Sequence, residues 1–463
     1  MSKNNSFYGI SKILSLISRD GARVHFSGVG GASMSSLFCL SHYFGISVSG
    51  SDKRDSALLS SLISRGADIV IGEREKLPDG VCLLVYSLAI GEDDRELMLA
   101  ARQEIPTVSR AEYMGALLEC YRERIAVSGS HGKSTVTAMI YSILREGGKN
   151  PTALSGASLG IGEGNFAVGG LQSVVYEACE YKDSFLLMPA DIGVFLNLEL
   201  DHVDYFKNFG EICDSFSKAI IKCGRAVINT DDRALRNLAD LRPDSIKVGS
   251  VGDEDYTFRV IKNEPRKLSF SLRARGGEPI EFTLPLMGEF NVKNAAVAAA
   301  VGLELGILPS VIVRALASFH GIGGRLENIG SLWGAPVYRD YAHHPTEILA
   351  GIRAVRSAVG GKVAVVFVPH TYSRTRAFLS ELAEALRTAD LAVVTEITAA
   401  RESDSTVSGA DLAEAAGAKF APSSDEVIPL LCEGYSAYMI MGAGDCDSVI
   451  DSLTRRGLLC ATC

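Results

Sequence analysis

One segment of the chain combines the residue types that bind nucleoside triphosphates. It runs from Ser128 to Thr135 and lies between a predicted strand and a predicted amphipathic helix. In such a loop, backbone amides surround the phosphates, a lysine neutralises the β and γ oxygens, and a hydroxyl binds Mg²⁺. Val127 stands where the full pattern has its first glycine, so the loop is a shortened variant. We therefore predict an ATP site formed by Gly129, Ser130, His131, Gly132, Lys133, Ser134 and Thr135.

A second glycine-rich loop, Gly28-Val29-Gly30-Gly31, follows an earlier predicted strand. Its glycines let the backbone approach a diphosphate, and the helix that follows supplies N–H donors. Taken alone, this loop with Asp52 after the next strand is typical of a dinucleotide site with Asp52 on a ribose hydroxyl. Ser33 occupies the third glycine position, and a tight structural turn is the alternative. Two phosphate loops in separate units predict two phosphorylated ligands, for which ATP-driven transfer or ligation is the simplest chemistry.

Acidic residues follow two further predicted strands. Glu177 and Glu180 come after one of them, and Asp201 and His202 come after the other. Carboxylates at the ends of parallel strands point into the crevice where the metal of a nucleotide lies, and oxygen ligands suit Mg²⁺. The alternative is that Asp201 caps a helix and that His202 packs in its first turn.

Basic residues gather in the last third of the chain, most of them directly after predicted strands. They are Arg325, His343, His344, His370, Arg374 and Arg376. In an acidic protein, such a cluster indicates a local site for an anion. The alternative for any single member is surface charge or a turn, since His343-His344-Pro345 can simply lead into a helix with proline at its first position.

The composition is that of a globular protein with ample core-forming material. The chain has 463 residues, of which 22% are charged and 47% are hydrophobic, and its net charge is −9. At about 150 residues per domain, this length predicts roughly three domains. The acidic balance argues against nucleic acid or an anionic membrane as a partner. With neither a long apolar run nor a signal-like N-terminus, we expect a cytoplasmic protein without a membrane partner.

The elements that must position these residues follow a strand-then-helix rhythm. Predicted strands cover 23–27, 46–49, 67–71, 81–87, 124–128, 173–176, 193–196, 226–229, 337–340, 363–368, 391–395 and 437–441. An alternating stretch over 256–286 predicts antiparallel hairpins, and 288–305 predicts an alanine-rich helix. The pattern predicts three α/β domains, covering residues 1–120, 121–322 and 323–463.

Taken in order, these motifs resemble those of the Mur ligases, and the resemblance runs through nearly the whole chain. The motifs are residues 25–31, 50–52, 129–134, 177–180, 201–204, 291–295, 340–347 and 369–375. The family fold implies a Rossmann-like first domain, a central P-loop ATPase-like domain and a Rossmann-like third domain. It implies a cytoplasmic enzyme of peptidoglycan synthesis that needs ATP and Mg²⁺. The best match is to the member that joins L-alanine to the lactyl carboxylate of UDP-N-acetylmuramate.

The resemblance also implies roles for individual residues. The first domain would bind the UDP-sugar through Gly28, Gly30, Gly31, Ser51, Asp52 and Ser87. The nucleotide contacts outside the ATP loop would be Asn291, Asn294, Arg325 and Asp340. The Mg²⁺ ligands would be Ser134, Glu177 and His202. The residues that carry the reaction would be Lys133, His202, Arg325, His344, His370 and Arg374.

Several positions depart from the family pattern. Phe290 replaces a histidine that is common before the asparagine pair, which leaves adenine a flat but apolar neighbour. Gly324 and Thr371 stand where many members have arginine, so Arg325 and Arg374 carry more of the anion contacts. Lys218 lies near the position of a carbamylated lysine in sister ligases, and we treat it as an ordinary surface lysine.

The implied mechanism has two steps. The lactyl carboxylate attacks the γ-phosphate of ATP, and the amine of L-alanine then attacks the resulting acyl phosphate. Closure of the third domain excludes water, and either His344 or His370 lies near the base that accepts the amine proton.

Three other readings stay open at this point. The nearest is the recycling ligase that attaches a tripeptide to the same UDP-sugar. A nicotinamide-dependent dehydrogenase would use the first glycine loop but leaves Lys133 and Ser134 unexplained. The third is a non-catalytic nucleotide-binding scaffold. For the oligomeric state of the chain, we expect a monomer or a homodimer.

Overall fold

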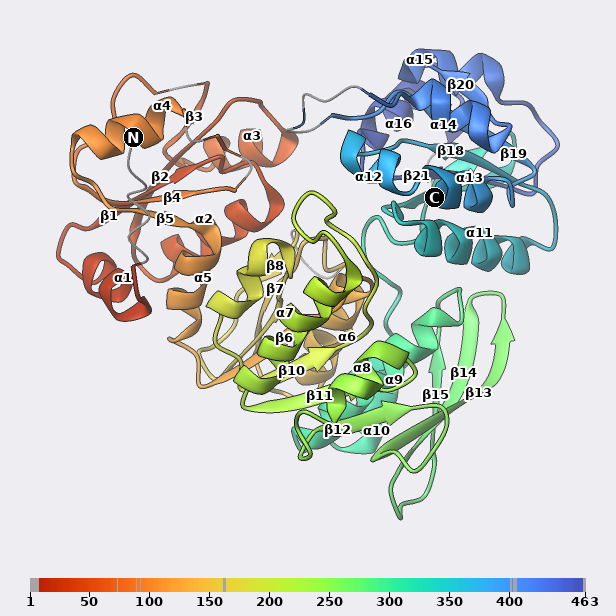
Figure 1. Cartoon of the computed structure of the whole chain (residues 1–463), viewed down its shortest axis with the longest axis horizontal. Helices are drawn as coiled ribbons and strands as arrows, with labels where there is room; N and C mark the ends of the chain where they lie inside the picture. The colour runs from red at the N-terminus through yellow and green to blue at the C-terminus, as the bar shows by residue number, and fades with distance from the viewer. Residues whose placement is uncertain are drawn as a thin grey trace.

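Three sheets, each flanked by helices, make up the chain (Figure 1). The structure is a computed structural model that describes residues 8–72, 74–88, 90–91, 93–160, 164–399, 402 and 406–460. The chain passes from the first sheet to the second over residues 110–122 and from the second to the third over residues 285–326. The predicted α/β architecture of three domains is confirmed.

The first sheet is parallel, with the strand order β3-β2-β1-β4-β5. Its strands are β1 (Arg23–Ser27), β2 (Ser47–Asp52), β3 (Ile69–Ile71), β4 (Val81–Tyr86) and β5 (Thr107–Ser109). Its helices are α1 (Ile10–Ile17), α2 (Ala32–Tyr43), α3 (Ala57–Ser64), α4 (Arg95–Arg102) and α5 (Arg110–Leu118). The strand order reverses between β1 and β4, and such a switch point opens a crevice at the carboxyl ends of the strands. The glycine loop 28–31 starts at that end.

The second sheet has ten strands, in the order β15-β14-β13-β12-β11-β10-β6-β9-β7-β8. They are β6 (Glu123–Ser128), β7 (Thr152–Leu154), β8 (Phe166–Ala167), β9 (Ser173–Glu177), β10 (Ile192–Phe195), β11 (Arg225–Asn229), β12 (Ile246–Gly249), β13 (Tyr256–Glu264), β14 (Lys267–Ala274) and β15 (Ile280–Leu284). The helices are α6 (Lys133–Glu146), η1 (Tyr181–Leu187), α7 (Phe209–Lys222), α8 (Arg233–Ala239), α9 (Phe290–Glu304) and α10 (Pro309–Ala317). Strands β13, β14 and β15 pair antiparallel, which confirms the predicted hairpins.

The third sheet has seven strands, in the order β20-β19-β18-β21-β17-β16-β22. They are β16 (Glu327–Leu332), β17 (Ala335–Asp340), β18 (Val363–Phe367), β19 (Leu391–Thr395), β20 (Lys419–Ala421), β21 (Ala437–Met441) and β22 (Leu459–Cys460). The helices are α11 (Pro345–Val359), α12 (Tyr372–Ala377), α13 (Leu379–Leu386), α14 (Gly409–Ala416), α15 (Ser424–Val427), η2 (Ile428–Leu430) and α16 (Cys446–Arg455). The segments after β17 and β18 carry most of the predicted basic cluster.

The buried side chains show how the domains are joined. One continuous hydrophobic cluster runs from Ile13 and Val24 in the first domain to Phe216 and Ile228 in the second. The third domain has two clusters of its own, one on each face of its sheet. The first two domains therefore share a core, whereas the third docks against them mainly through its surface.

The alternative in which Asp201 caps a helix and His202 packs in its first turn is wrong. No helix begins at Asp201, because the next described helix, α7, starts at Phe209. His202 lies in a turn with a left-handed φ of 51°, and the Asp201 carboxylate accepts the His202 backbone N–H at 2.7 Å. His344, by contrast, is the N-cap of α11 with Pro345 at the first helical position, which is the alternative that the sequence left open for this residue.

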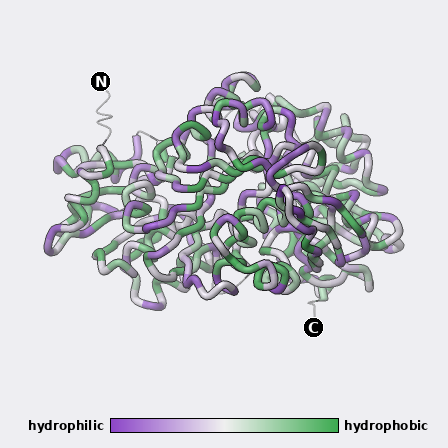
Figure 2. The backbone as a smooth tube through the Cα atoms, turned by 90° about the horizontal axis from the view of Figure 1, so that it is seen from below, coloured by the Kyte–Doolittle hydropathy of each residue, from purple (hydrophilic) through white to green (hydrophobic). Residues whose placement is uncertain are grey.

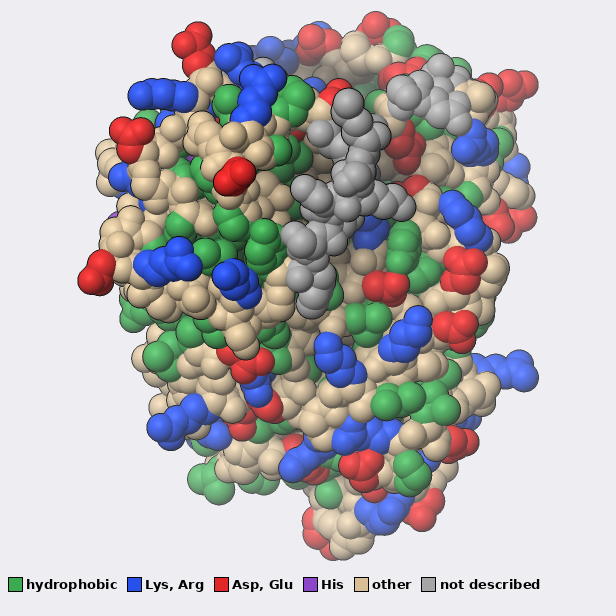
Figure 3. Space-filling model, turned by 60° about the vertical axis from the view of Figure 1, so that its left-hand side comes forward, with side chains coloured by type: hydrophobic (Ala, Val, Ile, Leu, Met, Phe, Trp, Pro, Cys, Tyr) green, Lys and Arg blue, Asp and Glu red, His purple; other side chains and the backbone are tan. Residues whose placement is uncertain are grey.

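Hydrophobic and hydrophilic residues are interspersed along the described part of the chain (Figure 2). Hydrophobic stretches alternate with hydrophilic ones in every part of the chain (Figure 2). Among the described residues, none of the helices combines the length and the apolar character needed to cross a membrane. On the face shown in Figure 3, basic and acidic side chains are interspersed.

Candidate active site

The predicted ATP loop connects β6 to α6 and is fastened to the segment after β10. Gly132, the N-cap of α6, has a φ of 83°, and a Cβ there would lie 2.8 Å from Asn294 Oδ1. The His131 backbone N–H donates to Asn197 Oδ1 at 2.7 Å, and Asn197 Nδ2 donates to the His131 carbonyl at 3.0 Å. The Ser130 hydroxyl accepts from the Glu199 N–H at 2.8 Å and donates to the Glu199 carbonyl. Glycine is thus required at position 132, and the loop is held rigidly in shape.

The Lys133 ammonium group is enclosed by its own loop and by one buried carboxylate. Nζ lies 2.5 Å from the Gly129 carbonyl oxygen and 3.1 Å from Glu180 Oε2. Glu180 is completely buried. Burial opposes the charge on Lys133, yet Glu180 and the neighbouring acidic groups raise the pKa of the ammonium above its ordinary value. Lys133 is therefore a permanent positive charge at the loop.

The three predicted Mg²⁺ ligands lie around this lysine. Ser134 is buried at the start of α6. His202 Nε2 lies 3.7 Å from Glu180 Oε1, and burial lowers the pKa of His202 although Asp201 and Glu180 oppose that change. Glu177 Oε1 accepts from the Ser155 hydroxyl at 2.6 Å and from the Gly156 N–H at 2.5 Å. A hydroxyl, a half-buried carboxylate and a neutral imidazole are a donor set that fits a divalent cation.

Predicted nucleotide contacts from two domains line one cavity of about 610 Å³. They are His131, Gly132, Thr135, Asn291, Asn294, Arg325 and Asp340. Asn294 Nδ2 donates to Asn291 Oδ1 at 3.2 Å, and Asn291 Nδ2 donates to the Met287 carbonyl, so both amides are oriented. Phe290 lines the same cavity and is 38% exposed. The predicted contacts, far apart in sequence, therefore meet at the joint between the second and third domains.

The third domain contributes a buried carboxylate and an arginine to this cavity. Asp340, at the end of β17, accepts N–H groups from Ala342 at 2.8 Å and Leu326 at 3.2 Å. Burial raises the pKa of Asp340 to about 6, although the nearby Arg325 lowers it. The Arg325 guanidinium lies over the Tyr341 ring, 4.7 Å from its centroid. Stacking of this kind fixes the arginine without using up its N–H donors.

A second contact between the domains involves the Asp-His motif. Arg374 on α12 donates from Nε and Nη2 to Asp201 Oδ1, at 3.1 and 2.9 Å. His343 Nε2 lies 3.8 Å from Asp201 Oδ2. Burial would raise the pKa of Asp201, but His343 and the Arg374 charge hold it well below its ordinary value. Asp201 is therefore ionised and binds the third domain.

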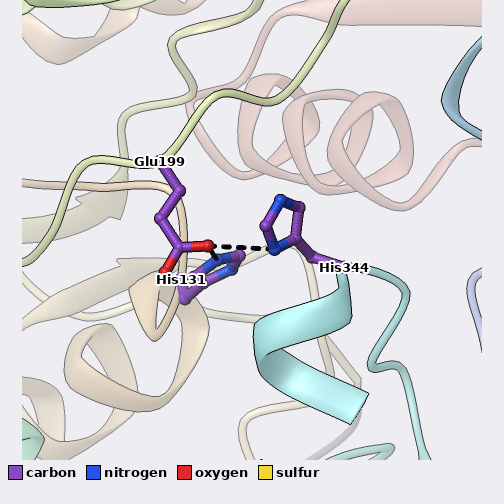
Figure 4. A group of neighbouring side chains, drawn as sticks. All are labelled: His131, Glu199 and His344. Carbon is purple, nitrogen blue, oxygen red and sulfur yellow. Dashed lines mark hydrogen bonds and ion pairs between the residues drawn. The ribbon is translucent and has the colours of Figure 1, made fainter. Parts of the chain in front are cut away.

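A third contact joins the ATP loop to the start of α11. His131 Nδ1 lies 3.0 Å from Glu347 Oε1, and His131 Nε2 lies 3.2 Å from Glu199 Oε2. His344 Nδ1 lies 3.0 Å from the same Glu199 oxygen (Figure 4). Burial lowers the pKa of His131, but the two carboxylates outweigh it and raise the pKa to about 10. Glu347 and Glu199 therefore strongly favour a positive charge between them.

The remaining predicted residues of the basic cluster lie after β18. His370 forms an isolated bridge with Thr398 and precedes Thr371, whose φ is 67°. Thr371 is buried and is the N-cap of α12, the helix that carries Arg374 and Arg376. The basic side chains of this loop thus sit at the same end of the sheet as Asp340.

The predicted UDP-sugar residues gather at the switch point of the first sheet. The Gly28 N–H donates to the Ser51 carbonyl at 2.9 Å, and the Gly30 N–H donates to Asp52 Oδ2 at 2.8 Å. A Cβ at Gly28 would lie 3.5 Å from Ser87 Cβ. The Ser51 hydroxyl donates to the buried Glu96 at 2.6 Å. Gly28, Gly30, Gly31, Ser51, Asp52 and Ser87 therefore form one loop cluster, in which Asp52 orients the glycine loop.

Sequence reasoning missed several contacts of the site and two of its residues. Glu180 and Asp201 were noted, but only the structure shows them bonded to Lys133 and Arg374. Glu199, in the Asn-Leu-Glu-Leu-Asp-His run, gave no signal beyond its place after a strand. Arg110 donates to the Ser33 hydroxyl at 3.0 Å beside the glycine loop, and its only signal was its place at the start of a helix.

The structure also describes Gly324, which departs from the family pattern, and Lys218, which lies near the modified position of sister ligases. Gly324 has a φ of 66°, and its N–H donates to Glu327, so this position favours glycine. Lys218 lies exposed on α7, as expected of an ordinary surface lysine.

Family models match three consecutive parts of the chain. The model described as "Mur ligase family, catalytic domain" matches residues 23–122, and "Mur ligase middle domain" matches residues 127–302. The model described as "Mur ligase, glutamate ligase domain" matches residues 324–445.

Curated relatives match most of the chain. UDP-N-acetylmuramate--L-alanine ligase from Caldicellulosiruptor bescii is 38% identical over 81% of this chain and 84% of its own length. The protein of the same name from Agathobacter rectalis is 34% identical over 94% of this chain and 98% of its own length.

Solved structures share the fold. UDP-N-acetylmuramate-alanine ligase from Thermotoga maritima superposes with a TM-score of 0.81 at 25% identity, over 94% of this chain and 99% of that one. A murein peptide ligase from Psychrobacter arcticus has a TM-score of 0.72 at 21% identity, over 95% of this chain and 100% of that one.

Proposed function

This chain belongs to the Mur ligase family, and on that premise we propose that it joins L-alanine to the lactyl carboxylate of UDP-N-acetylmuramate, with cleavage of ATP to ADP and phosphate. The observation that carries the proposal is the match, over most of the chain, to relatives named UDP-N-acetylmuramate--L-alanine ligase. The reaction places this enzyme in peptidoglycan synthesis. We assign the UDP-sugar to the first domain, ATP to the second and the amino acid to the third.

In the first step, the lactyl carboxylate attacks the γ-phosphate and ADP leaves. The Ser130 and His131 amides donate to Asn197, so the other backbone amides of the loop bind the phosphates. Lys133 offsets the charge that spreads over the transferred oxygens. Mg²⁺, which Ser134, Glu177 and His202 would hold, supplies further positive charge to the phosphates when bound. Bonds to Asn197 and Glu199 hold the loop in shape.

In the second step, the neutral amine of L-alanine attacks the acyl phosphate, and phosphate leaves as the amide forms. The ammonium proton passes to a base in the third domain, a role that we assign to His344 or His370. Arg374 and Arg325 offset negative charge at the reacting end. Because an acyl phosphate is destroyed by water, the interdomain contacts of Arg374 and His344 serve the reaction by closing the site.

The tripeptide ligase is the second candidate, because a murein peptide ligase shares this fold. The sequence identity favours L-alanine, since the relatives that carry that name reach 38%.

Phosphate release tests the proposal. The enzyme is given ATP, Mg²⁺ and UDP-N-acetylmuramate with L-alanine, glycine, L-serine or the tripeptide in turn. We expect release with L-alanine at the highest kcat/KM. Release with the tripeptide alone, or release that does not depend on the amino acceptor, contradicts the proposal.

A further inference from the structure

Three potential metal ligands from two domains converge beside the ATP loop. Figure 4 shows His131 from the β6–α6 loop, Glu199 from the segment after β10 and His344 from the N-cap of α11. One ligand atom from each of these side chains lies within 4.8 Å of the other two. They point at a common centre although 68 residues separate the first from the second.

The state of His344 indicates that the cluster is more than an ion pair. Nδ1 lies 3.0 Å from Glu199 Oε2 in an ion-pair contact. Within the part of the chain that the structure describes, Nε2 has no hydrogen-bond partner, although the residue is only 6% exposed. Buried polar atoms normally have partners, so an imidazole held against a carboxylate in this way can offer a lone pair to a cation.

The groups behind the three side chains hold them as supporting residues hold metal ligands. Glu347 Oε1 lies 3.0 Å from His131 Nδ1, the ring nitrogen that faces away from Glu199. The Thr346 hydroxyl donates to Glu199 Oε2 at 2.8 Å. A carboxylate on the second nitrogen of a ligating histidine fixes the ring and strengthens it as a ligand.

We propose that His131, Glu199 and His344 bind a divalent transition-metal ion such as Zn²⁺ or Co²⁺. Two imidazole nitrogens and one carboxylate oxygen suit these ions, whereas Mg²⁺ is bound mainly through oxygen, and the set assigned to it has only one imidazole. The site differs from the set of Ser134, Glu177 and His202 assigned to Mg²⁺. His131 and Glu199 line the large cavity, so a fourth ligand position can open toward it. Since His344 comes from the third domain, a bound ion ties that domain to the second. It also takes the lone pair of His344, so that His370 is the remaining candidate for the base.

The test uses the full chain in a buffer with excess Mg²⁺ at one fixed pH, without ATP or UDP-sugar. Co²⁺ is titrated and its visible absorption is recorded for the parent, His131→Gln, His344→Gln and His320→Gln. His320 is the matched control, because it lines the same cavity but lies outside the cluster. We expect one saturable Co²⁺ site in the parent and in His320→Gln. In the two cluster variants, the Co²⁺ affinity should be lower by at least about 10-fold.

Two outcomes overturn the proposal. One is equal Co²⁺ affinity in His344→Gln and the parent. The other is a strong sulfur-to-cobalt charge-transfer band, which assigns the ion to cysteine. Thermal unfolding adds a second measurement: Zn²⁺ should raise the Tm of the parent and of His320→Gln but not that of His344→Gln. Thr346→Val, which keeps all three ligands, should weaken binding less than His344→Gln does. Because no substrate is present, failure here is distinct from failure of the proposed ligase activity.

Discussion

Arg374 of the third domain donates to Asp201 of the second at 2.9 Å, and the two side chains are only 11% and 5% exposed. The pair forms only when the third domain is docked. An arginine that we assign to the reacting end is therefore positioned by a carboxylate from another domain, and a functional residue and domain closure are coupled in one contact.

Loss of either member of this pair should remove the same contribution. We expect Arg374→Gln and Asp201→Asn each to lower kcat/KM for L-alanine, and the double variant to be little worse than the poorer single one. The resulting coupling energy should be about 1–3 kcal/mol. Arg356 and Asp390, 2.6 Å apart but 37% and 33% exposed, are the control and should couple by less than about 1 kcal/mol. Additive effects at Arg374 and Asp201 would show that the pair does not act as a unit.

Lys133→Ala should lower the rate of ATP-dependent phosphate release by at least about 100-fold and should leave UDP-sugar binding intact. It should also lower the free energy of unfolding by about 3–5 kcal/mol, because the buried Glu180 loses its charge partner. Adding Glu180→Gln should restore stability but not activity. Equal turnover by Lys133→Ala and the parent would refute the assignment of the ATP loop.

Asp340→Asn should stabilise the free enzyme at neutral pH. The folded state raises the pKa of Asp340 from its ordinary value of about 4 to about 6, so this group lowers stability progressively as the pH rises from about 4 through 6. The gain should be on the order of 2 kcal/mol at pH 7 and should nearly vanish at pH 4, where the parent is protonated. Urea unfolding at the two values of pH measures it. The same variant should lose ligase activity, because Asp340 lines the nucleotide cavity. A larger gain at pH 4 than at pH 7 would contradict the assignment.

Phe290→Ala should raise KM for ATP by about 3-fold to 10-fold, because the ring lines the cavity and offers a flat surface to adenine. KM for the UDP-sugar should not change. Phe290→His keeps a flat ring and should stay within about 3-fold of the parent. An unchanged KM for ATP in Phe290→Ala would place adenine elsewhere.

The fold was largely predictable because its strands are short apolar runs bounded by glycine and polar turns. Val363–Phe367 is buried at every position, as a strand covered on both faces must be. The two phosphate loops were predictable for a similar reason, since a left-handed position such as Gly132 requires a particular residue.

The interdomain contacts could not be predicted from the chain. Asp201 and Arg374 are 173 residues apart, and their contact depends on how two separately packed domains dock. The place of Glu180 and Glu177 after the same strand does not tell their contacts apart. Only the packing shows that Glu180 pairs with Lys133 and that Glu177 bonds to the turn at Ser155.

The hydrophobic cluster shared by the first two domains has a consequence for how the three substrates are brought together. In the proposed reaction, the spacing between the UDP-sugar and ATP is set when the chain folds, because the two domains that carry the phosphate loops share one hydrophobic cluster. The entropy of orienting these two reactants is thus settled during folding rather than at each turnover. Only the amino acid must be brought into place at each turnover, by motion of the third domain.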